Sequence, residues 1–276
     1  MSNSNLYKFM RGGKSYRISL QGDIYGLKFW EDFANRKYEP DTQSLIEGFC
    51  REGSIFIDIG AAYGSMTLLA AGSGATVYAY EPNPSVFQGL EINTSLNEKL
   101  KKSIKLSNEA VSSNSGTLNF EKENLSEVLS PIVFTNWANK TSVEVVALRD
   151  IIQDLTTNSS KTSSIIIKMD IEGAEWKILK DLSTLKVLKS SKSIIILAIH
   201  PGLHRPPKST STPLGRLRFY LWNVRNLIDC WFFYNRLSRY CTIHRTNLNR
   251  VRRPLLFCFL VLGGNHEFVL NFGRAA

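Results

Sequence analysis

The chain has 276 residues with 43% apolar and 21% charged, which suits one large α/β domain with additions and excludes a disordered or fibrous chain. Four widely separated cysteines without a CxxC pair exclude a disulfide framework and a zinc ribbon, and they favour a reducing compartment. The net charge of +10 comes from residues 205–253, where eleven Lys or Arg face one acid, Asp229, so we expect any anionic partner at that segment.

The N-terminal residues contain no apolar run of signal-peptide length. No stretch of the chain approaches the roughly 18 apolar residues that span a bilayer. We therefore expect a cytoplasmic protein.

From about residue 54 to 200, short apolar runs alternate with helical patterns, which is typical of βαβ units and a parallel sheet. The pattern predicts helices after Gly64, at 84–96 and at 174–182. It predicts strands at 54–60, 76–80, 104–111, 141–148, 164–169 and 193–199.

A loop rich in Pro, Ser and Thr at 205–213 marks a boundary. Residues 214–237 then show the three-and-four spacing of an amphipathic helix whose polar positions are mostly Arg and Asn. Strands at 240–246 and 266–272 return to the sheet, while the apolar run 255–262 fits either a helix or a strand.

The fold class that follows is α/β, with a doubly wound, mostly parallel Rossmann-like sheet of about seven strands, one of them antiparallel, and helices on both faces. We divide the chain into N-terminal strands and a helix (1–50), the catalytic core (51–201), a basic amphipathic insertion (202–239) and C-terminal strands that complete the sheet (240–276).

The first core strand ends in a loop of small residues, DIGAAYG at 58–64. Gly60 and Gly64 allow the backbone to pass close to a ligand, and Asp58 can anchor an ammonium group. Glu81 ends the second strand about twenty residues later, where a carboxylate can accept hydrogen bonds from both hydroxyls of a ribose. Together these features predict an adenosyl cofactor such as S-adenosylmethionine, and the lack of GxGxxG disfavours a nicotinamide dinucleotide.

Several blocks resemble, in order, those of the FkbM-like methyltransferases, which are class I S-adenosylmethionine enzymes. They are YEP at 38–40, FIDIGAAYG at 56–64, YEPNP at 80–84, EAV at 109–111 and the specific block IKMDIEGAEW at 167–176. The resemblance covers residues 38–201 and implies S-adenosyl-L-methionine as the cofactor. The residues it places at the cofactor are Asp58, Gly60, Ala61, Tyr63, Gly64, Glu81, Pro82, Asn83, Glu109, Ala110 and Asp170.

The chain also departs from the family pattern. Ala62 stands where the family usually has asparagine, and Leu148-Arg149-Asp150 stands where Leu-Asp-Asp is usual. The usual glutamate near the end of the fifth strand is replaced in the stretch around His200.

Methyl transfer needs an acceptor aligned with the sulfonium methyl and, for a hydroxyl, a group that removes its proton. We expect Asp170, Glu172 and His200 to be catalytic, with Asp170 orienting acceptor or cofactor. For His200 a general base and a loop histidine bonded to backbone weigh equally. For Glu175 a capping role weighs at least as much as catalysis. Asp170 and Glu172 lack a third ligand, so we predict no metal.

The basic amphipathic segment has three interpretations: a lid beside the active site, then a helix on an anionic membrane surface, then a nucleic-acid contact. For the whole chain we predict O-methylation of a hydroxyl on a sugar, glycan or other small molecule, a substrate class that the family resemblance implies. Two alternatives stay open: a membrane- or RNA-binding protein with a degenerate methyltransferase fold, and a nicotinamide-dependent oxidoreductase. The oligomeric state is not predicted.

Overall fold

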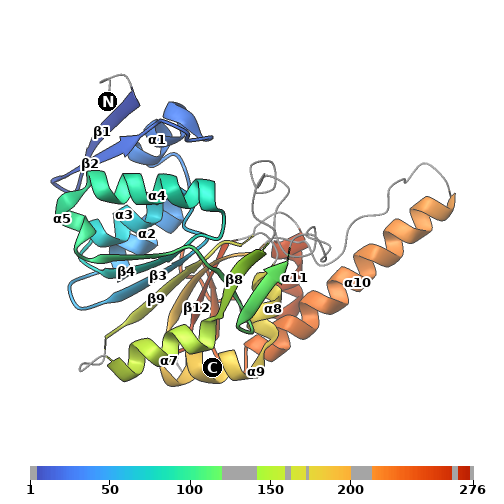
Figure 1. Ribbon diagram of the computed structural model, residues 1–276. Helices are drawn as coiled ribbons and strands as arrows, with labels where there is room; N and C mark the ends of the chain where they lie inside the picture. Colours follow the sequence, from blue (N-terminus) through green and yellow to red (C-terminus); the bar gives the residue numbers. More distant parts are fainter. Residues whose placement is uncertain are drawn as a thin grey trace.

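A seven-stranded sheet forms the centre of the computed structural model, which describes residues 5–119, 142–158, 163–171, 174–199, 213–262 and 267–273 (Figure 1). Its strand order is β11-β12-β10-β9-β3-β4-β5. The strands are β3 (Ile55–Ile59), β4 (Thr76–Tyr80), β5 (Ile104–Ser107), β9 (Ile165–Met169), β10 (Ile194–Ala198), β11 (Thr242–Arg245) and β12 (Glu267–Asn271). Only β12 runs antiparallel to its neighbours, β10 and β11. The predicted fold class is confirmed.

Strands β3 and β9 are buried along their whole length, as their apolar, β-branched sequences predict. Successive side chains point to opposite faces of the sheet, so Ile55 and Ile57 join one core cluster while Phe56 joins the other. The strand order reverses between these two strands, because β3 leads outward to β4 and β9 leads outward to β10. Ligands of doubly wound sheets bind at the carboxyl ends of such a pair.

Helices cover both faces of the sheet (Figure 1). One core cluster includes residues of α2 (Pro40–Phe49), α3 (Ser65–Gly72) and α4 (Pro84–Leu96). The N-terminal hairpin, β1 (Leu6–Arg11) and β2 (Lys14–Ser19), packs on the same side with α1 (Gly26–Ala34), while the short α5 (Glu98–Lys101) follows α4. The other cluster includes residues of α7 (Leu148–Asn158), α8 (Glu175–Lys180) and α9 (Leu182–Ser190).

The strand predicted at 104–111 is two strands, which corrects the sequence analysis. Residues after β5 leave the main sheet, and β6 (Ala110–Ser112) enters a smaller sheet with β8 (Ser142–Ala147) and β7 (Gly116–Asn119). The break lies at Asn108, whose Nδ2 donates to the carbonyl oxygens of Glu81 and Pro82 at 2.8 and 3.1 Å. These side-chain bonds take the place of a strand ladder and turn the chain.

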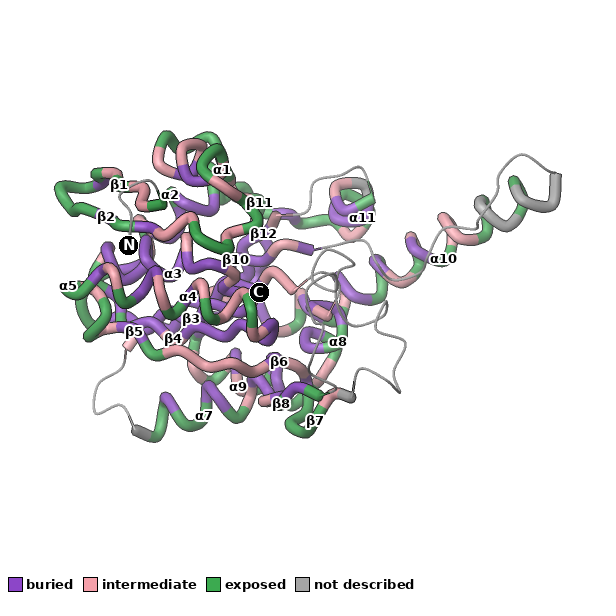
Figure 2. Tube along the Cα trace, turned by 45° about the horizontal axis from the view of Figure 1, so that its top comes forward, coloured by how far each residue is buried: buried purple, intermediate pink, exposed green. Residues whose placement is uncertain are grey.

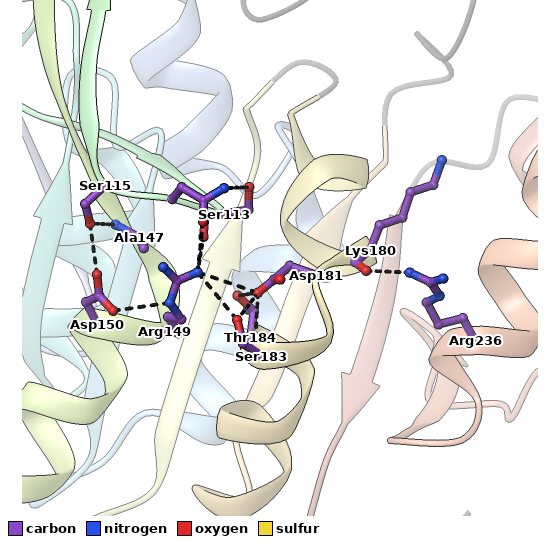
Figure 3. A network of polar contacts seen from close by, with 11 residues as sticks. Ser113, Ser115, Ala147, Arg149, Asp150, Lys180, Asp181, Ser183, Thr184 and Arg236 are labelled. Atoms are coloured by element: carbon purple, nitrogen blue, oxygen red, sulfur yellow. Dashed lines mark hydrogen bonds and ion pairs between the residues drawn. The ribbon is translucent and has the colours of Figure 1, made fainter.

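Arg149, the departure from the usual Leu-Asp-Asp, connects the smaller sheet to α9 (Figure 3). Its guanidinium donates to the carbonyl oxygen of Ser113 and lies 3.8 Å from the carboxylate of Asp181. Asp181 caps α9 by accepting from the backbone N–H of Thr184 at 2.8 Å. The arginine therefore has a structural role here.

The C-terminal part adds two helices, α10 (Pro213–Leu237) and α11 (Pro254–Leu262). The run 255–262, which fits either a helix or a strand in the sequence, lies in α11. Its buried side is formed by Phe257, Cys258 and Val261. In both views the first half of α10 extends away from the body of the protein (Figure 1, Figure 2). Within the described residues, no helix combines the length and apolar character that a bilayer crossing requires.

Candidate active site

A cavity opens at the carboxyl ends of β3, β4 and β9, on the edge of the sheet that the strand reversal predicts. Its empty volume is about 1100 Å³, part of it open to solvent. Predicted site residues that line it are Asp58, Gly60, Ala61, Tyr63, Glu81, Pro82, Asn83 and Asp170. Further lining residues include Tyr25, Tyr38, Glu39, Ala62 and Lys168. Residues distant in the sequence thus share one cavity.

Glycine is required at two positions of the loop after β3. Gly60 has φ 82°, and a Cβ there would overlap the backbone carbonyl oxygen of Asp170. The loop therefore lies directly against the segment that follows β9. Gly64 has φ 90° and precedes α3, where a Cβ would lie 2.6 Å from Leu90 Cδ1.

Asp58 is fully buried at the floor of the cavity. Its Oδ2 accepts a hydrogen bond from Thr67 Oγ1 at 2.6 Å, while Oδ1 has no partner among the described residues. Burial raises the pKa of this carboxyl, and the charge of Lys168 opposes that rise. A buried carboxylate oxygen without a donor is an open position for a cationic or N–H group of a ligand.

Glu81 directly follows β4, and backbone N–H groups on either side hold its carboxylate. Its Oε2 accepts from the N–H of Ala62 at 3.0 Å, and its Oε1 accepts from the N–H of Asn83 at 2.8 Å. Burial raises the pKa of Glu81 to about 7, against the lowering effect of these two hydrogen bonds. The remaining lone pairs of both oxygens can accept further hydrogen bonds.

Lys168 is the charged residue of the otherwise apolar β9, and it is 7% exposed. Its Nζ lies 3.2 Å from Asp170 Oδ2. Burial alone would lower the pKa of Lys168, but the carboxylates of Asp170, Glu39 and Asp58 outweigh burial and raise it. The lysine stays charged and fixes the Asp170 carboxylate at the cavity wall.

The charge of the cavity fits an S-adenosylmethionine ligand. Among the described residues that line it are four acids, Glu39, Asp58, Glu81 and Asp170, and one lysine, Lys168. A ligand with a sulfonium and an ammonium group complements this excess of negative charge. The pyrophosphate of a nicotinamide dinucleotide would be repelled by it.

Glu109 and Ala110 line a second cavity, which shares Gly60, Pro82 and Ile171 with the first. The residues predicted for one cofactor are therefore distributed over two adjoining cavities. Gly64 lines neither cavity and caps α3.

Two predicted catalytic residues, Glu172 and His200, lie outside the described residues. Glu175 is buried, and its Oε1 accepts from the backbone N–H of Ile171 at 3.0 Å. It thus holds the backbone at Ile171, directly after Asp170, which is a structural contact; this N–H lies before α8 and is not one of its first turn.

The sequence analysis missed the N-terminal wall of the cavity, formed by Tyr25, Tyr38 and Glu39. Glu39 adopts a left-handed conformation with φ 41°, which is uncommon for a residue with a side chain. The signal was present in the YEP block at 38–40, which was recognised but given no role. The buried lysine within β9 was a second signal, because a buried charge needs partners nearby.

Ala62, the departure from the usual asparagine, also adopts a left-handed conformation, with φ 49°. Asparagine tolerates this region better than alanine does. We expect Ala62→Asn to raise the free energy of unfolding of the ligand-free protein by about 0.5–1 kcal/mol in urea titrations. Ala62→Val should lower it, and equal effects of the two changes would contradict the conformational explanation.

A doubly wound sheet with an acid-lined cavity at its strand reversal defines an enzyme of the class that binds an adenosyl cofactor. The family model of the methyltransferase FkbM domain matches residues 58–208, more than half of the chain. The chain belongs to the FkbM methyltransferase family, and its cofactor is S-adenosylmethionine.

The hexuronic acid methyltransferase AglP of Haloferax volcanii is 27% identical over 182 residues, which cover 65% of this chain and 69% of that protein. A solved methyltransferase from Agrobacterium tumefaciens is 12% identical with a TM-score of 0.36, covering 72% of this chain and 55% of that one. This chain thus spans little more than half of that structure. A putative rRNA methylase from Clostridium thermocellum is 8% identical with a TM-score of 0.41, covering 86% and 96%. The family assignment rests on the domain match.

Proposed function

We propose that this protein transfers the methyl group of S-adenosylmethionine to a hydroxyl of a sugar, glycan or other small molecule. The observation that carries the proposal is the buried, unpartnered Oδ1 of Asp58 in a cavity that also holds the Asp170 carboxylate. A sugar acceptor is supported by the similarity to AglP, which is a hexuronic acid methyltransferase.

When bound, S-adenosylmethionine supplies an electrophilic methyl group on a positively charged sulfur. Asp58 would accept a hydrogen bond from the ammonium group of its methionine part, and Glu81 would accept hydrogen bonds from its ribose hydroxyls. Glu109 and Ala110, in the adjoining cavity, hold the remaining part of the cofactor. These residues fix the methyl group relative to the chain.

Asp170 acts on the acceptor. Its carboxylate would orient an acceptor hydroxyl in the cavity and accept the proton of that hydroxyl, while bound S-adenosylmethionine would supply the methyl group. Lys168 holds this carboxylate in place through the ion pair at 3.2 Å. Glu172 and His200 are the further candidates for proton removal.

Isothermal titration with S-adenosylmethionine and S-adenosylhomocysteine, with NAD as the control, tests the cofactor assignment directly. We expect a Kd on the order of micromolar for the first two ligands and no heat with NAD. An acceptor screen then begins with uronic acids and continues with neutral sugars and glycans, and it measures release of S-adenosylhomocysteine. Failure of both adenosyl ligands to bind would favour a degenerate fold kept for its basic surface.

A further inference from the structure

Helix α10 has two apolar faces, of which only one is buried. Its inner face comprises Cys230, Phe233, Tyr234 and Leu237, which are all buried in the core. The outer face comprises Leu217, Tyr220, Leu221, Ile228, Trp231 and Phe232, which are between 41% and 64% exposed. Leu217, Leu221, Ile228 and Phe232 recur at intervals of four and seven residues, so they lie on one side of the helix. Figure 2 shows buried and exposed stretches alternating along α10.

Contacts of the inner face fix how the helix is turned. The ring of Phe233 lies 4.3 Å from that of Trp176 in α8, and the hydroxyl of Tyr234 donates to the carbonyl oxygen of Val251 at 2.9 Å. Arg236 donates to the carbonyl oxygen of Lys180 at 2.6 Å, the bond drawn in Figure 3. The outer face therefore cannot turn inward without breaking these contacts. In this orientation the described residues leave the outer face of α10 exposed, even if α10 acts as a lid.

Exposed arginines accompany the exposed apolar residues. Arg225 is exposed and flanks the outer face of α10. Arg252 and Arg253 come directly before α11, whose Leu255 and Leu256 are 56% and 46% exposed. The whole net positive charge of the chain lies in residues 205–253. The partner of this region must offer both an apolar phase and negative charge.

We propose that the outer face of α10 and the start of α11 form a docking surface for an anionic membrane, on which α10 lies without crossing it. Leucine, isoleucine and phenylalanine enter the acyl boundary, while arginines meet lipid phosphates and Trp231 and Tyr220 lie at the headgroups. A second copy of the chain would place one arginine-rich surface against another, which like-charge repulsion opposes. A nucleic acid would neutralise the arginines but leave the aliphatic side chains in water.

Vesicle sedimentation tests the proposal on the full chain. We expect binding to phosphatidylcholine vesicles that contain about one third phosphatidylglycerol, with at least about tenfold weaker binding to phosphatidylcholine alone. The double change Ile228→Glu and Phe232→Glu should weaken binding at least about tenfold. Its matched control is Met10→Glu with Leu182→Glu, two residues 65% and 47% exposed elsewhere, which should leave binding unchanged.

A second set of variants tests whether the arginines of this surface contribute to binding through their position and not only through the net charge of the chain. Arg225→Gln, Arg252→Gln and Arg253→Gln together should weaken binding at least about tenfold, whereas Lys99→Gln, Lys101→Gln and Lys102→Gln remove the same charge from another surface and should not. Equal binding to both kinds of vesicle, or equal losses in variants and controls, would overturn the proposal. A dimer detected by light scattering that dissociates when Ile228→Glu and Phe232→Glu are introduced would also overturn it. Binding to single-stranded RNA without binding to vesicles would do the same.

Discussion

Asp170→Asn is expected to lower kcat by about 10²- to 10⁴-fold, with the affinity for S-adenosylmethionine changed by less than about tenfold. The amide keeps the shape of the side chain but cannot take the proton of an acceptor hydroxyl. Cofactor affinity is largely retained because Asp58 and Glu81 hold the other parts of the cofactor. Turnover is measured as S-adenosylhomocysteine release with an acceptor from the screen, and affinity by titration calorimetry.

Stability must be separated from chemistry in this variant, because Asp170 is paired with the buried Lys168 at 3.2 Å. Removing one partner of a buried ion pair destabilises a protein, although Lys168 here keeps the carboxylates of Glu39 and Asp58 nearby. Thermal unfolding with and without S-adenosylhomocysteine shows whether the folded site persists. Asp154→Asn, on the exposed side of α7, is the matched control. Turnover of Asp170→Asn within about twofold of the wild type would remove Asp170 from the chemistry.

The parallel core was predictable because its central strands, β3 and β9, are buried on both faces and therefore consist mostly of apolar, β-branched residues. The meeting of Asp58, Glu81 and Asp170 at one cavity was predictable for a related reason. Asp58 lies near the carboxyl end of β3, Glu81 and Asp170 directly follow β4 and β9, and the carboxyl ends of parallel strands meet at one edge. No long-range information was needed to bring these three residues together.

Features that depend on tertiary contacts were not predictable. Tyr25, Tyr38 and Glu39 reach the cavity from segments before the first core strand, where no periodicity points to a ligand site. The end of β5 is set by hydrogen bonds from the Asn108 side chain to the carbonyl oxygens of Glu81 and Pro82. The pattern of apolar residues does not indicate such bonds. The helix α11 was ambiguous because its apolar run of eight residues, 255–262, fits either period.

The exposed outer face of α10 was also hidden from the sequence, because a broad apolar stripe predicts burial by default. Tertiary contacts such as the packing of Phe233 on Trp176 and the hydrogen bond from Tyr234 to Val251 decide which part of the stripe is buried.

Glu81→Ala is expected to weaken S-adenosylmethionine binding by about 10²-fold, since it removes the proposed acceptor for two ribose hydroxyls and the carboxylate that accepts from the backbone N–H groups of Ala62 and Asn83. Glu91→Ala, an exposed glutamate of α4, is the matched control and should bind normally. Unchanged affinity of Glu81→Ala would place the ribose elsewhere in the cavity.

The raised pKa of Glu81 adds a pH dependence with a defined sign. In the proposed binding mode the ionised Glu81 carboxylate accepts hydrogen bonds from the ribose hydroxyls. The pKa of Glu81 is about 7 in the ligand-free protein. Affinity should therefore rise by about tenfold from roughly pH 6 to pH 8 and then level off, and binding below pH 7 should release a proton. Titrations in two buffers of different ionisation enthalpy measure that proton directly. Glu81→Gln, which cannot titrate, should abolish both effects.

The same shift acts on stability in the opposite direction. A carboxyl whose pKa rises from 4.5 when unfolded to about 7 when folded favours the folded state most below pH 4.5, and this contribution is lost as pH rises through 7. The ligand-free protein should lose about 3 kcal/mol of unfolding free energy from this group across that window. S-adenosylhomocysteine should restore stability above pH 7, because the cofactor binds the ionised form that burial disfavours. The contrary result would be an unfolding free energy of the ligand-free protein that does not change between pH 4.5 and 7 and equals that of Glu81→Gln. It would show that Glu81 is already ionised in the folded protein at acidic pH.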